Sequence, residues 1–277
     1  MSTVFLRVDG EPVEGQGAAL ATDRGLGYGD GVFRTMRLRA GAIPAWALHR
    51  AKLVADAGRI GLAIGSEALD RLERDLGDLV AVCSEATVRI TVTAGSGPRG
   101  YRRSPSTAAR ILLRAESTDD LPTLAGESVA VRLCDLRLSF QPRLAGVKHL
   151  NRLEQVLARA EWDDPATAEG LMLDVEDTLV CGTMSNLFIV EGERLSTPLI
   201  DRCGVAGVQR HRILEWARRN GVEAVEQRLP AERLHGEVSV LVSNSVLGVR
   251  WVSHVDQRAL AGKPTMFDAL TEWVDRA

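Results

Sequence analysis

The sequence predicts an α+β fold built from two domains, and three observations lead to it. With 277 residues, 45% of them hydrophobic, the chain is long enough to bury two modest cores. Apolar residues alternate with polar ones in some segments and recur at helical spacing in others. These strand and helix patterns do not follow each other in regular β-α-β order, so we expect layers of helix and sheet instead of a doubly wound sheet.

Strands in the first half of the chain are predicted where apolar and polar residues alternate or where a turn dipeptide follows a short apolar run. These segments are residues 4–8 and 12–13, which flank Asp9-Gly10, and residues 32–38, 87–93 and 109–115. Residues 25–31 are too rich in glycine for regular structure and are expected to form a loop. Helical spacing predicts one helix from Ala47 to about Leu62 and a second one capped by Ser66.

A polar stretch closed by Pro122 separates a smaller N-terminal domain, residues 1–118, from a larger C-terminal domain, residues 119–277. In the second half, the predicted strands are 128–134, 170–174, 186–190, 223–229, 238–242 and 249–255, and the predicted helices are 208–220 and one from about Thr265. Apolar residues from Leu150 to Ala160 also recur at helical spacing. We therefore expect a further helix to begin immediately after Lys148.

Net charge and cysteine use narrow the classes of function. A formal charge of −3 with both signs interspersed predicts no nucleic-acid-binding face, so a small-molecule partner is expected. Cys83, Cys134, Cys181 and Cys203 form no C-x-x-C pair, which is typical of free thiols in a reducing compartment. The sequence shows no signal-peptide pattern and no apolar run of about 18 residues. We expect a cytoplasmic protein without a membrane or metal site.

One lysine stands out as a candidate nucleophile. Only three of the 34 basic residues are lysines, namely Lys52, Lys148 and Lys263. Arginine stays protonated at any working pH, whereas a lysine amine can lose its proton, attack a carbonyl and form a Schiff base. At the mouth of the predicted helix, the partial positive charge of the N-terminus would lower the pKa of Lys148. The alternative is an ordinary solvated lysine in a loop.

Four segments carry a resemblance to a known family: residues 22–33 with Thr35, and residues 95–101, 144–157 and 182–188. On these segments the chain resembles the class IV aminotransferases, pyridoxal-phosphate enzymes with the D-amino acid aminotransferase-like fold, and within them the aminodeoxychorismate lyases. The resemblance implies a cofactor held in an interdomain cleft, Lys148 as the lysine that binds it covalently, and a homodimer.

The phosphate of the cofactor needs an anchor, and two segments fit. Val208 and Gln209 open a predicted helix, where backbone N–H groups bind anions, and Ser245 follows a strand with a hydroxyl to offer. Relatives place an arginine where this chain has Lys52, which gives a point charge in place of a bidentate fork; Arg50 is the fallback. Taken singly, the first segment would be read as a plain helix start and the second as a polar turn; the two together after a candidate lysine favour a phosphate site.

Cys181 is the more serious departure, because relatives carry a glutamate there that pairs with the pyridine nitrogen of the cofactor. A cysteine is a weaker partner, so the cofactor should be a weaker electron sink. A transaminase would suffer most from this change. A lyase whose product is aromatic would tolerate it, because aromatisation drives the reaction. The alternative for Cys181 is a small buried strand residue.

The resemblance also implies residues that act on the substrate. Thr35 matches a threonine beside the cofactor, where its hydroxyl can relay a proton to the departing enolpyruvate. Arg99 and Tyr101 are candidates for binding the two carboxylates of the substrate, and Tyr28 is a candidate for the wall of the cleft. A β-branched strand residue and a plain hairpin tip are the structural alternatives for Thr35 and for the Arg99 loop.

The implied function is a pyridoxal-phosphate-dependent lyase that converts 4-amino-4-deoxychorismate to 4-aminobenzoate, a folate precursor, and pyruvate. Two alternatives stay open. One is a transaminase of the same fold that acts on D- or branched-chain amino acids. The other is a non-catalytic relative that binds the cofactor or a partner, for which Cys181 and Lys52 are the motive.

Overall fold

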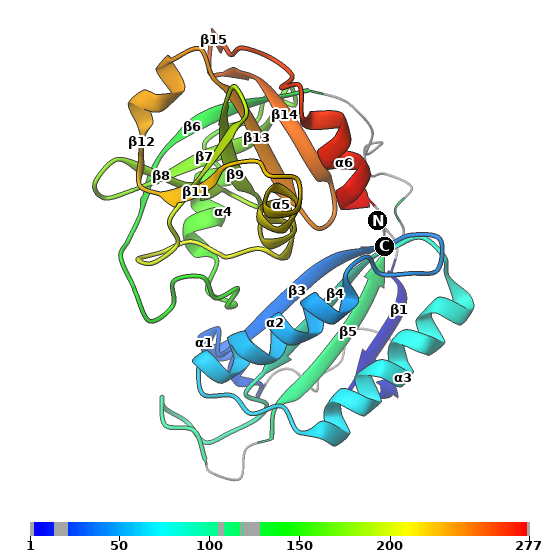
Figure 1. Cartoon of the computed structure of the whole chain (residues 1–277). Helices are drawn as coiled ribbons and strands as arrows, with labels where there is room; N and C mark the ends of the chain where they lie inside the picture. Colours follow the sequence, from blue (N-terminus) through cyan, green and yellow to red (C-terminus); the bar gives the residue numbers. More distant parts are fainter. Residues whose placement is uncertain (1–2, 14–21, 105–107, 117, 119–127, 276–277) are drawn as a thin grey trace. The chain divides into compact units, whose positions relative to one another are not determined.

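A computed structural model of the chain describes residues 3–13, 22–104, 108–116, 118 and 128–275. The described residues fall into two compact units (Figure 1). One comprises those within Met1–Leu121 together with Val147–Asn151, and the other those within Pro122–Gly146 and Arg152–Arg276. The predicted domain boundary between residues 118 and 119 falls beside residues 119–127, which lie outside the described residues. Lys148 belongs to the first unit.

The first unit is an antiparallel sheet with strand order β2-β1-β5-β4-β3 and two long helices. The strands are β1 (Thr3–Val8), β2 (Glu11–Pro12), β3 (Gly31–Leu38), β4 (Ala86–Thr93) and β5 (Arg110–Glu116), and the helices are α2 (Trp46–Arg59) and α3 (Ser66–Val82). Figure 1 shows both helices in front of the sheet. The predicted strands and both predicted helices of this half are therefore confirmed, although Gly65, not Ser66, is the N-cap of α3.

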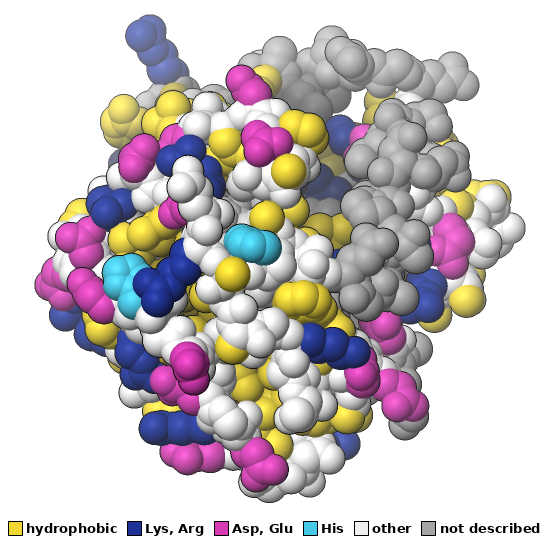
Figure 2. Space-filling model, turned by 90° about the horizontal axis from the view of Figure 1, so that it is seen from above, with side chains coloured by type: hydrophobic (Ala, Val, Ile, Leu, Met, Phe, Trp, Pro, Cys, Tyr) yellow, Lys and Arg dark blue, Asp and Glu magenta, His cyan; other side chains and the backbone are white. Residues whose placement is uncertain are grey.

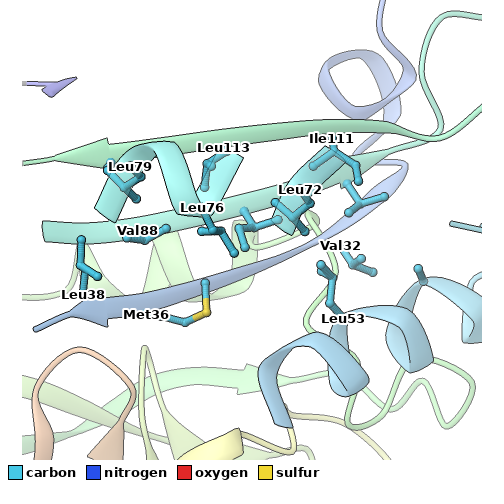
Figure 3. Packing of buried hydrophobic residues seen from close by; sticks show 14 of the residues in the cluster. Val32, Met36, Leu38, Leu53, Leu72, Leu76, Leu79, Val88, Ile111 and Leu113 are labelled. Atoms are coloured by element: carbon cyan, nitrogen blue, oxygen red, sulfur yellow. The ribbon is translucent and has the colours of Figure 1, made fainter. Parts of the chain in front are cut away.

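The core of the first unit lies between this sheet and the two helices. Figure 3 shows Leu72 and Leu76 of α3 directed at the strands and Leu53 of α2 beside Val32 of β3. Every second residue of β3 points into this core, among them Val32 and Met36, and the residues between them lie on the opposite face of the sheet. That opposite face carries Phe33 and Thr35.

The predicted loop at residues 25–31 is wrong in part, because the chain forms the short helix α1 (Arg24–Tyr28) there. The Asp23 carboxylate accepts the N–H of Gly25 at 2.7 Å and so caps the helix, and Gly29 ends it in the left-handed region at φ 65°. Glycine is needed at position 25 because α1 packs against Thr93 there, and a Cβ on Gly25 would clash with that side chain. The glycines that predicted a loop instead allow the chain to pack closely against its neighbours.

The second unit is a larger mixed sheet with strand order β11-β10-β9-β13-β14-β6-β7-β8-β12, and β15 pairs with β14. The strands are β6 (Val129–Leu138), β7 (Thr167–Asp174), β8 (Thr178–Gly182), β9 (Asn186–Glu191), β10 (Arg194–Pro198), β11 (Ala224–Gln227), β12 (Leu229–Pro230), β13 (Ser239–Asn244), β14 (Gly248–Val255) and β15 (Arg258–Ala259). The helices are α4 (Leu153–Arg159), α5 (Val208–Arg219), α6 (Phe267–Asp275) and the 3-10 helix η2 (Ala231–His235).

Strands β9 and β13 are buried on both faces. Phe188 and Leu241 pack with α5 and α6, whereas their neighbours Ile189 and Val240 pack with a second cluster that includes Leu171. Burial on both sides explains why these strands read as continuous apolar runs in the sequence. Away from the core, the part of the surface not drawn in grey in Figure 2 carries dark blue and magenta side chains interspersed.

Two predictions for the second unit are wrong. The helix after Lys148 begins at Leu153 and not directly after the lysine, and the predicted strand 223–229 is divided into β11 and β12. Strands β8 and β10 were not predicted, because each has only 5 residues and mixes apolar with small polar side chains. Within the described residues, no helix is long and apolar enough to cross a membrane.

Candidate active site

Lys148 lies in an extended segment that adds an edge to the sheet of the first unit. The N–H of Phe33 donates to the carbonyl of Lys148 at 3.0 Å, and the N–H of Leu150 donates to the carbonyl of Gly31 at 2.9 Å. His149 forms the bridge partner of Val32 between them. The expectation that a helix terminus lowers the pKa of Lys148 is therefore wrong, because the backbone here pairs with β3 and α4 begins only at Leu153.

The register of this segment sets the direction of the Lys148 side chain. Because His149 pairs with Val32, Lys148 stands opposite Phe33, on the sheet face away from α2 and α3. Its Nζ lies 4.6 Å from the centroid of the Phe33 ring. Thr35 is two residues along β3 on the same face and pairs with Arg89 of β4. The structure thus brings Lys148 and Thr35, both predicted site residues, onto one sheet face.

Arg89 is a candidate that the sequence reasoning missed. Its guanidinium carbon lies 4.0 Å from the centroid of the Phe33 ring, and its Nε donates to the Thr91 hydroxyl at 3.4 Å. Burial lowers the pKa of Arg89, and Arg114 lowers it further while Glu116 opposes the change. A partly buried cation on the face of Lys148 fits an anionic ligand. The alternation over residues 87–93 places Arg89 on the polar face of its strand but does not show that Lys148 lies on that face.

Lys52 of α2 takes part in a buried charge cluster. Its ammonium binds the carboxylate of Asp56, one helical turn away, and the same carboxylate binds Arg34 of β3. Burial lowers the pKa of Lys52, and the attraction of Asp56 opposes this only in part. The fallback residue Arg50 instead pairs with Glu73 at 3.1 Å. Asp56 also accepts the backbone N–H of Lys148. The ammonium of Lys52 therefore lies close to the Lys148 segment.

The loop with Arg99 and Tyr101 is held to α1. The Tyr28 hydroxyl accepts the N–H of Gly100 at 3.1 Å, and the rings of Tyr28 and Tyr101 meet edge to face at 5.6 Å. Arg24 donates to the carbonyls of Gly100 and Tyr101 at 2.8 and 2.9 Å. The structure brings Tyr28 and Tyr101 together, with Tyr101 88% exposed and Arg99 on the surface of the same loop.

Asp30 supports this loop through two arginines. Its carboxylate binds Arg24 at 2.9 Å and Arg103 at 3.0 Å. Burial alone would raise the pKa of Asp30, but the hydrogen bonds and charges of Arg103 and Arg24 outweigh it and lower the pKa. Charged contacts thereby fix the C-terminal side of the loop, at residues 100–103.

In the second unit, Cys181 is buried on β8, next to a turn made by residues 182–185. Glu169 of β7 holds this turn: its carboxylate accepts the N–H groups of Thr183 and Met184 at 3.0 and 3.2 Å and the hydroxyl of Ser185 at 2.7 Å. Beside Cys181, burial lowers the pKa of Arg152, and the charge of a Cys181 thiolate would oppose that change.

The N-terminus of α5 is built as an anion cradle. No side chain caps this helix, so the N–H groups of its first turn, which includes the buried Val208 and Gln209, point outward as donors. Asn186 fixes the approach to the helix, since its Oδ1 accepts the N–H of Gly207 at 3.1 Å and its Nδ2 donates to the carbonyl of Val205 at 2.7 Å. A Cβ on Gly207 would clash with Asn186.

Two hydroxyl groups lie at the C-terminal end of β13 in the same unit. Ser243 pairs with Asn186 across β13 and β9, and its Oγ is buried without a hydrogen-bond partner among the described residues. Asn244 shapes the turn by accepting the N–H groups of Val246 and Leu247 at 2.9 and 2.7 Å, and Ser245 lies half-buried in that turn. Free N–H groups and an orphaned hydroxyl fit a phosphate group.

Each unit, taken by itself, carries groups of the kind that a phosphorylated carbonyl cofactor needs. The first unit has an amine on the sheet face that bears Phe33 and Thr35, and the second unit has the helix start at Val208, the unpartnered Ser243 hydroxyl and the buried thiol of Cys181. Cys134 and Cys203 are not reactive candidates, since burial raises the pKa of each thiol to about 12. No group of three or more His, Cys, Asp or Glu in the described ranges is placed to hold a metal ion.

Comparison with known proteins agrees with this assignment. The family model described as amino-transferase class IV matches residues 31–255. An aminodeoxychorismate lyase of Vibrio harveyi is 34% identical over 84% of this chain and 86% of its own length. The crystal structure of 4-amino-4-deoxychorismate lyase from Pseudomonas aeruginosa is 36% identical and superimposes with a TM-score of 0.87 over 97% of both chains.

A second solved structure supports the fold alone. It is the pyridoxal-phosphate-bound form of a hypothetical aminotransferase from Mycobacterium tuberculosis, 18% identical to this chain. Its TM-score is 0.83, and the match covers 99% of this chain and 98% of that one. The predicted class IV aminotransferase-like α+β fold is confirmed by these likenesses.

Proposed function

Because the chain belongs to the class IV aminotransferase family, we propose that it is a pyridoxal-phosphate-dependent lyase acting on 4-amino-4-deoxychorismate. The products are 4-aminobenzoate, which serves folate synthesis, and pyruvate. The lyases at 34% and 36% identity, each matched over most of its length, favour this reaction over transamination. The observation that carries the proposal is the Lys148 amine on the sheet face that also bears Thr35.

The residues that we assign to the cofactor are those that the sequence and its family resemblance predict. Lys148 would bind its aldehyde carbon covalently, the N–H groups of Val208 and Gln209 and the hydroxyl of Ser245 would bind its phosphate, and Lys52 would add positive charge. When bound, pyridoxal phosphate supplies an electron sink for the bonds broken at the substrate amine. The unpartnered Ser243 hydroxyl and the uncapped start of α5 support the phosphate assignment.

Lys148 and Thr35 move the protons of the reaction. Once its amine is free, Lys148 Nζ takes the proton from C4 of the substrate, the C–O bond to the enolpyruvyl group breaks, and the ring becomes aromatic. The Thr35 hydroxyl relays a proton to the released enolpyruvate, which becomes pyruvate. Arg89, Arg99 and Tyr101 are the groups we assign to the two substrate carboxylates, with Tyr28 beside them.

Cys181 fits a lyase better than a transaminase. A buried thiol is a weaker partner for a pyridine nitrogen than a carboxylate, and aromatisation of the product lowers the demand on the electron sink. We expect Cys181→Glu to raise transaminase side activity and to leave the lyase rate within about threefold. A large gain in lyase rate would argue against this reasoning.

The test of the function is product analysis without a keto-acid acceptor. Purified protein loaded with pyridoxal phosphate should release pyruvate and 4-aminobenzoate in equal amounts from aminodeoxychorismate. Turnover only after a keto acid is added would identify a transaminase, and cofactor binding without turnover a non-catalytic relative. Homodimerisation and a cytoplasmic location are further parts of the proposal, supported by the family, and size-exclusion chromatography with light scattering tests the first.

A further inference from the structure

We propose that Asp56 is the positioning residue of Lys148, a role that rests on the proposed function. Asp56 lies in α2, and none of its surface is exposed. Its Oδ2 accepts the backbone N–H of Lys148 at 3.1 Å, across 92 residues of sequence. The carboxylate thereby fixes the backbone of the residue whose amine forms the covalent bond to the cofactor.

The bond to Asp56 lies at the end of a β-ladder. In a regular antiparallel ladder, the N–H of a residue paired like Lys148 points at the carbonyl of its partner, here Phe33. Lys148 accepts from Phe33 in the regular way, but its own N–H donates to Asp56. The edge strand therefore leaves β3 at Lys148, and Asp56 defines the place where its side chain emerges.

Two cations bind the carboxylate of Asp56. A fully buried carboxylate is costly unless cations and hydrogen bonds compensate it. Arg34 of β3 and Lys52 of α2 both bind this carboxylate, and Arg34 is itself buried. One side chain thus joins a helix, a strand and the Lys148 segment. Apolar residues would fill the same space at a lower cost in desolvation free energy. This argues that the cluster positions Lys148 in addition to stabilising the fold.

The same carboxylate also fixes Lys52. The Lys52 ammonium, proposed to face the cofactor phosphate, and the Lys148 backbone meet two oxygens of one group, Oδ1 and Oδ2 of Asp56. Asp56 therefore fixes the Lys52 ammonium relative to the backbone of Lys148. It touches neither the substrate nor the reacting atoms and acts only through these two lysines.

A paired apolar replacement separates positioning from folding. Asp56→Leu with Arg34→Met removes the two fully buried charges together and leaves only the partly exposed Lys52, and such exchanges of buried pairs are often neutral for stability. We expect the melting temperature to stay within a few degrees of wild type, while hydrogen exchange of the Lys148 amide in the cofactor-free protein accelerates by about tenfold to a hundredfold. Borohydride-trapped cofactor at Lys148 should form about tenfold more slowly. kcat should fall by a similar factor and KM by less than about threefold.

The matched control is Asp75→Leu, the same substitution at a buried aspartate of α3 in the same core. It should leave the Lys148 amide exchange and the trapping rate unchanged. Should the double variant not fold, the wild-type amides still decide: Lys148 should be protected as strongly as Leu150, whose N–H is bound to Gly31.

Three results would overturn the assignment. They are an unprotected Lys148 amide in the wild type, unchanged exchange in the folded double variant, and an equal effect of Asp75→Leu. Failure of the proposed lyase function would give a different set of results. In that case the amide exchange and the trapping rate still respond to the double variant, but no pyruvate forms from the substrate.

Discussion

Two buried carboxylates, one in each unit, hold the segments that carry the proposed chemistry, and they do so in opposite ways. Asp56 fixes the Lys148 segment with its charge balanced by Arg34 and Lys52. Glu169 fixes the turn after Cys181 with neutral donors only, the N–H and hydroxyl groups of residues 183–185 and the N–H of Gly170. Asp56 and its buried partner Arg34 can be replaced together by apolar residues, because both charges are on side chains. Glu169 cannot be replaced in this way, because the backbone N–H groups that bind it cannot be removed by mutation.

The largest expected effect is that of Asp56→Asn. Loss of the charge leaves the buried Arg34 and the half-buried Lys52 without their anion, which should cost about 3–5 kcal/mol in the free energy of unfolding. Urea unfolding of the single variant and of Asp56→Leu/Arg34→Met measures this. If the Asp56 cluster can be replaced as a charged pair, the double variant should recover most of the unfolding free energy that Asp56→Asn loses. Equal loss in both variants would show that Asp56 is held by packing and not by charge.

Glu169→Gln should lower the free energy of unfolding somewhat less, by about 2–3 kcal/mol. The NH2 group of the glutamine would face the N–H and hydroxyl donors that the carboxylate now accepts. The same unfolding assay applies. Ser185→Ala, which removes a single hydroxyl donor, serves as the control and should cost about 1 kcal/mol. Combining Ser185→Ala with Glu169→Gln should bring no recovery, in contrast to the Asp56 pair. A clear recovery would remove the distinction drawn between the two anchors.

Gly207→Ala tests the cradle at α5 without touching a charge. The new Cβ would clash with Asn186 and loosen the segment that leads to Val208 and Gln209. We expect pyridoxal-phosphate affinity to fall by about tenfold, as measured by titration of absorbance. Gly65→Ala is the matched control, since Gly65 is also an uncapped N-cap and its Cβ would meet nothing within 4 Å. A similar loss in both variants would attribute the effect to capping alone.

Asp30→Asn gives the smallest effect and a pH signature. The pKa of Asp30 is lowered in the fold, so its contribution is complete above the unfolded value of 3.8 and disappears as pH falls through the lower folded value. We expect a loss of about 1 kcal/mol at pH 7 that vanishes in acid. Asp75→Asn should act with the opposite sign, because burial raises the pKa of Asp75 and its charge is unfavourable at pH 7. Thermal melting across pH compares the two.

Local patterns predicted most of the fold, and long-range contacts account for what they missed. The alternation in β3 and β4 and the helical spacing in α2 and α5 are properties of short windows, and those elements are found as expected. The extended state of residues 147–151 depends on β3, and the apolar stripe that pointed to an earlier helix consists in part of exposed residues such as Leu153 and Val156.

The candidate site divides in the same way. Lys148 was found from its chemistry, yet its predicted helical setting was wrong. Asp56 was not found, because on an amphipathic helix it reads as an ordinary polar residue and its partners Arg34 and Lys148 lie 22 and 92 residues away. Arg89 was missed since its role depends on the face it shares with Lys148, which only the register of the edge segment reveals.

The central claim is that Lys148 alone carries the cofactor, and the scarcity of lysine makes it directly testable. Protein incubated with pyridoxal phosphate is reduced with borohydride, digested and mapped by mass spectrometry, where only Lys52, Lys148 and Lys263 can be labelled on a side chain. We predict the pyridoxyl mass on the peptide with Lys148, and its loss in Lys148→Arg. Label on Lys52 or Lys263 instead, or no label at all, would contradict the account.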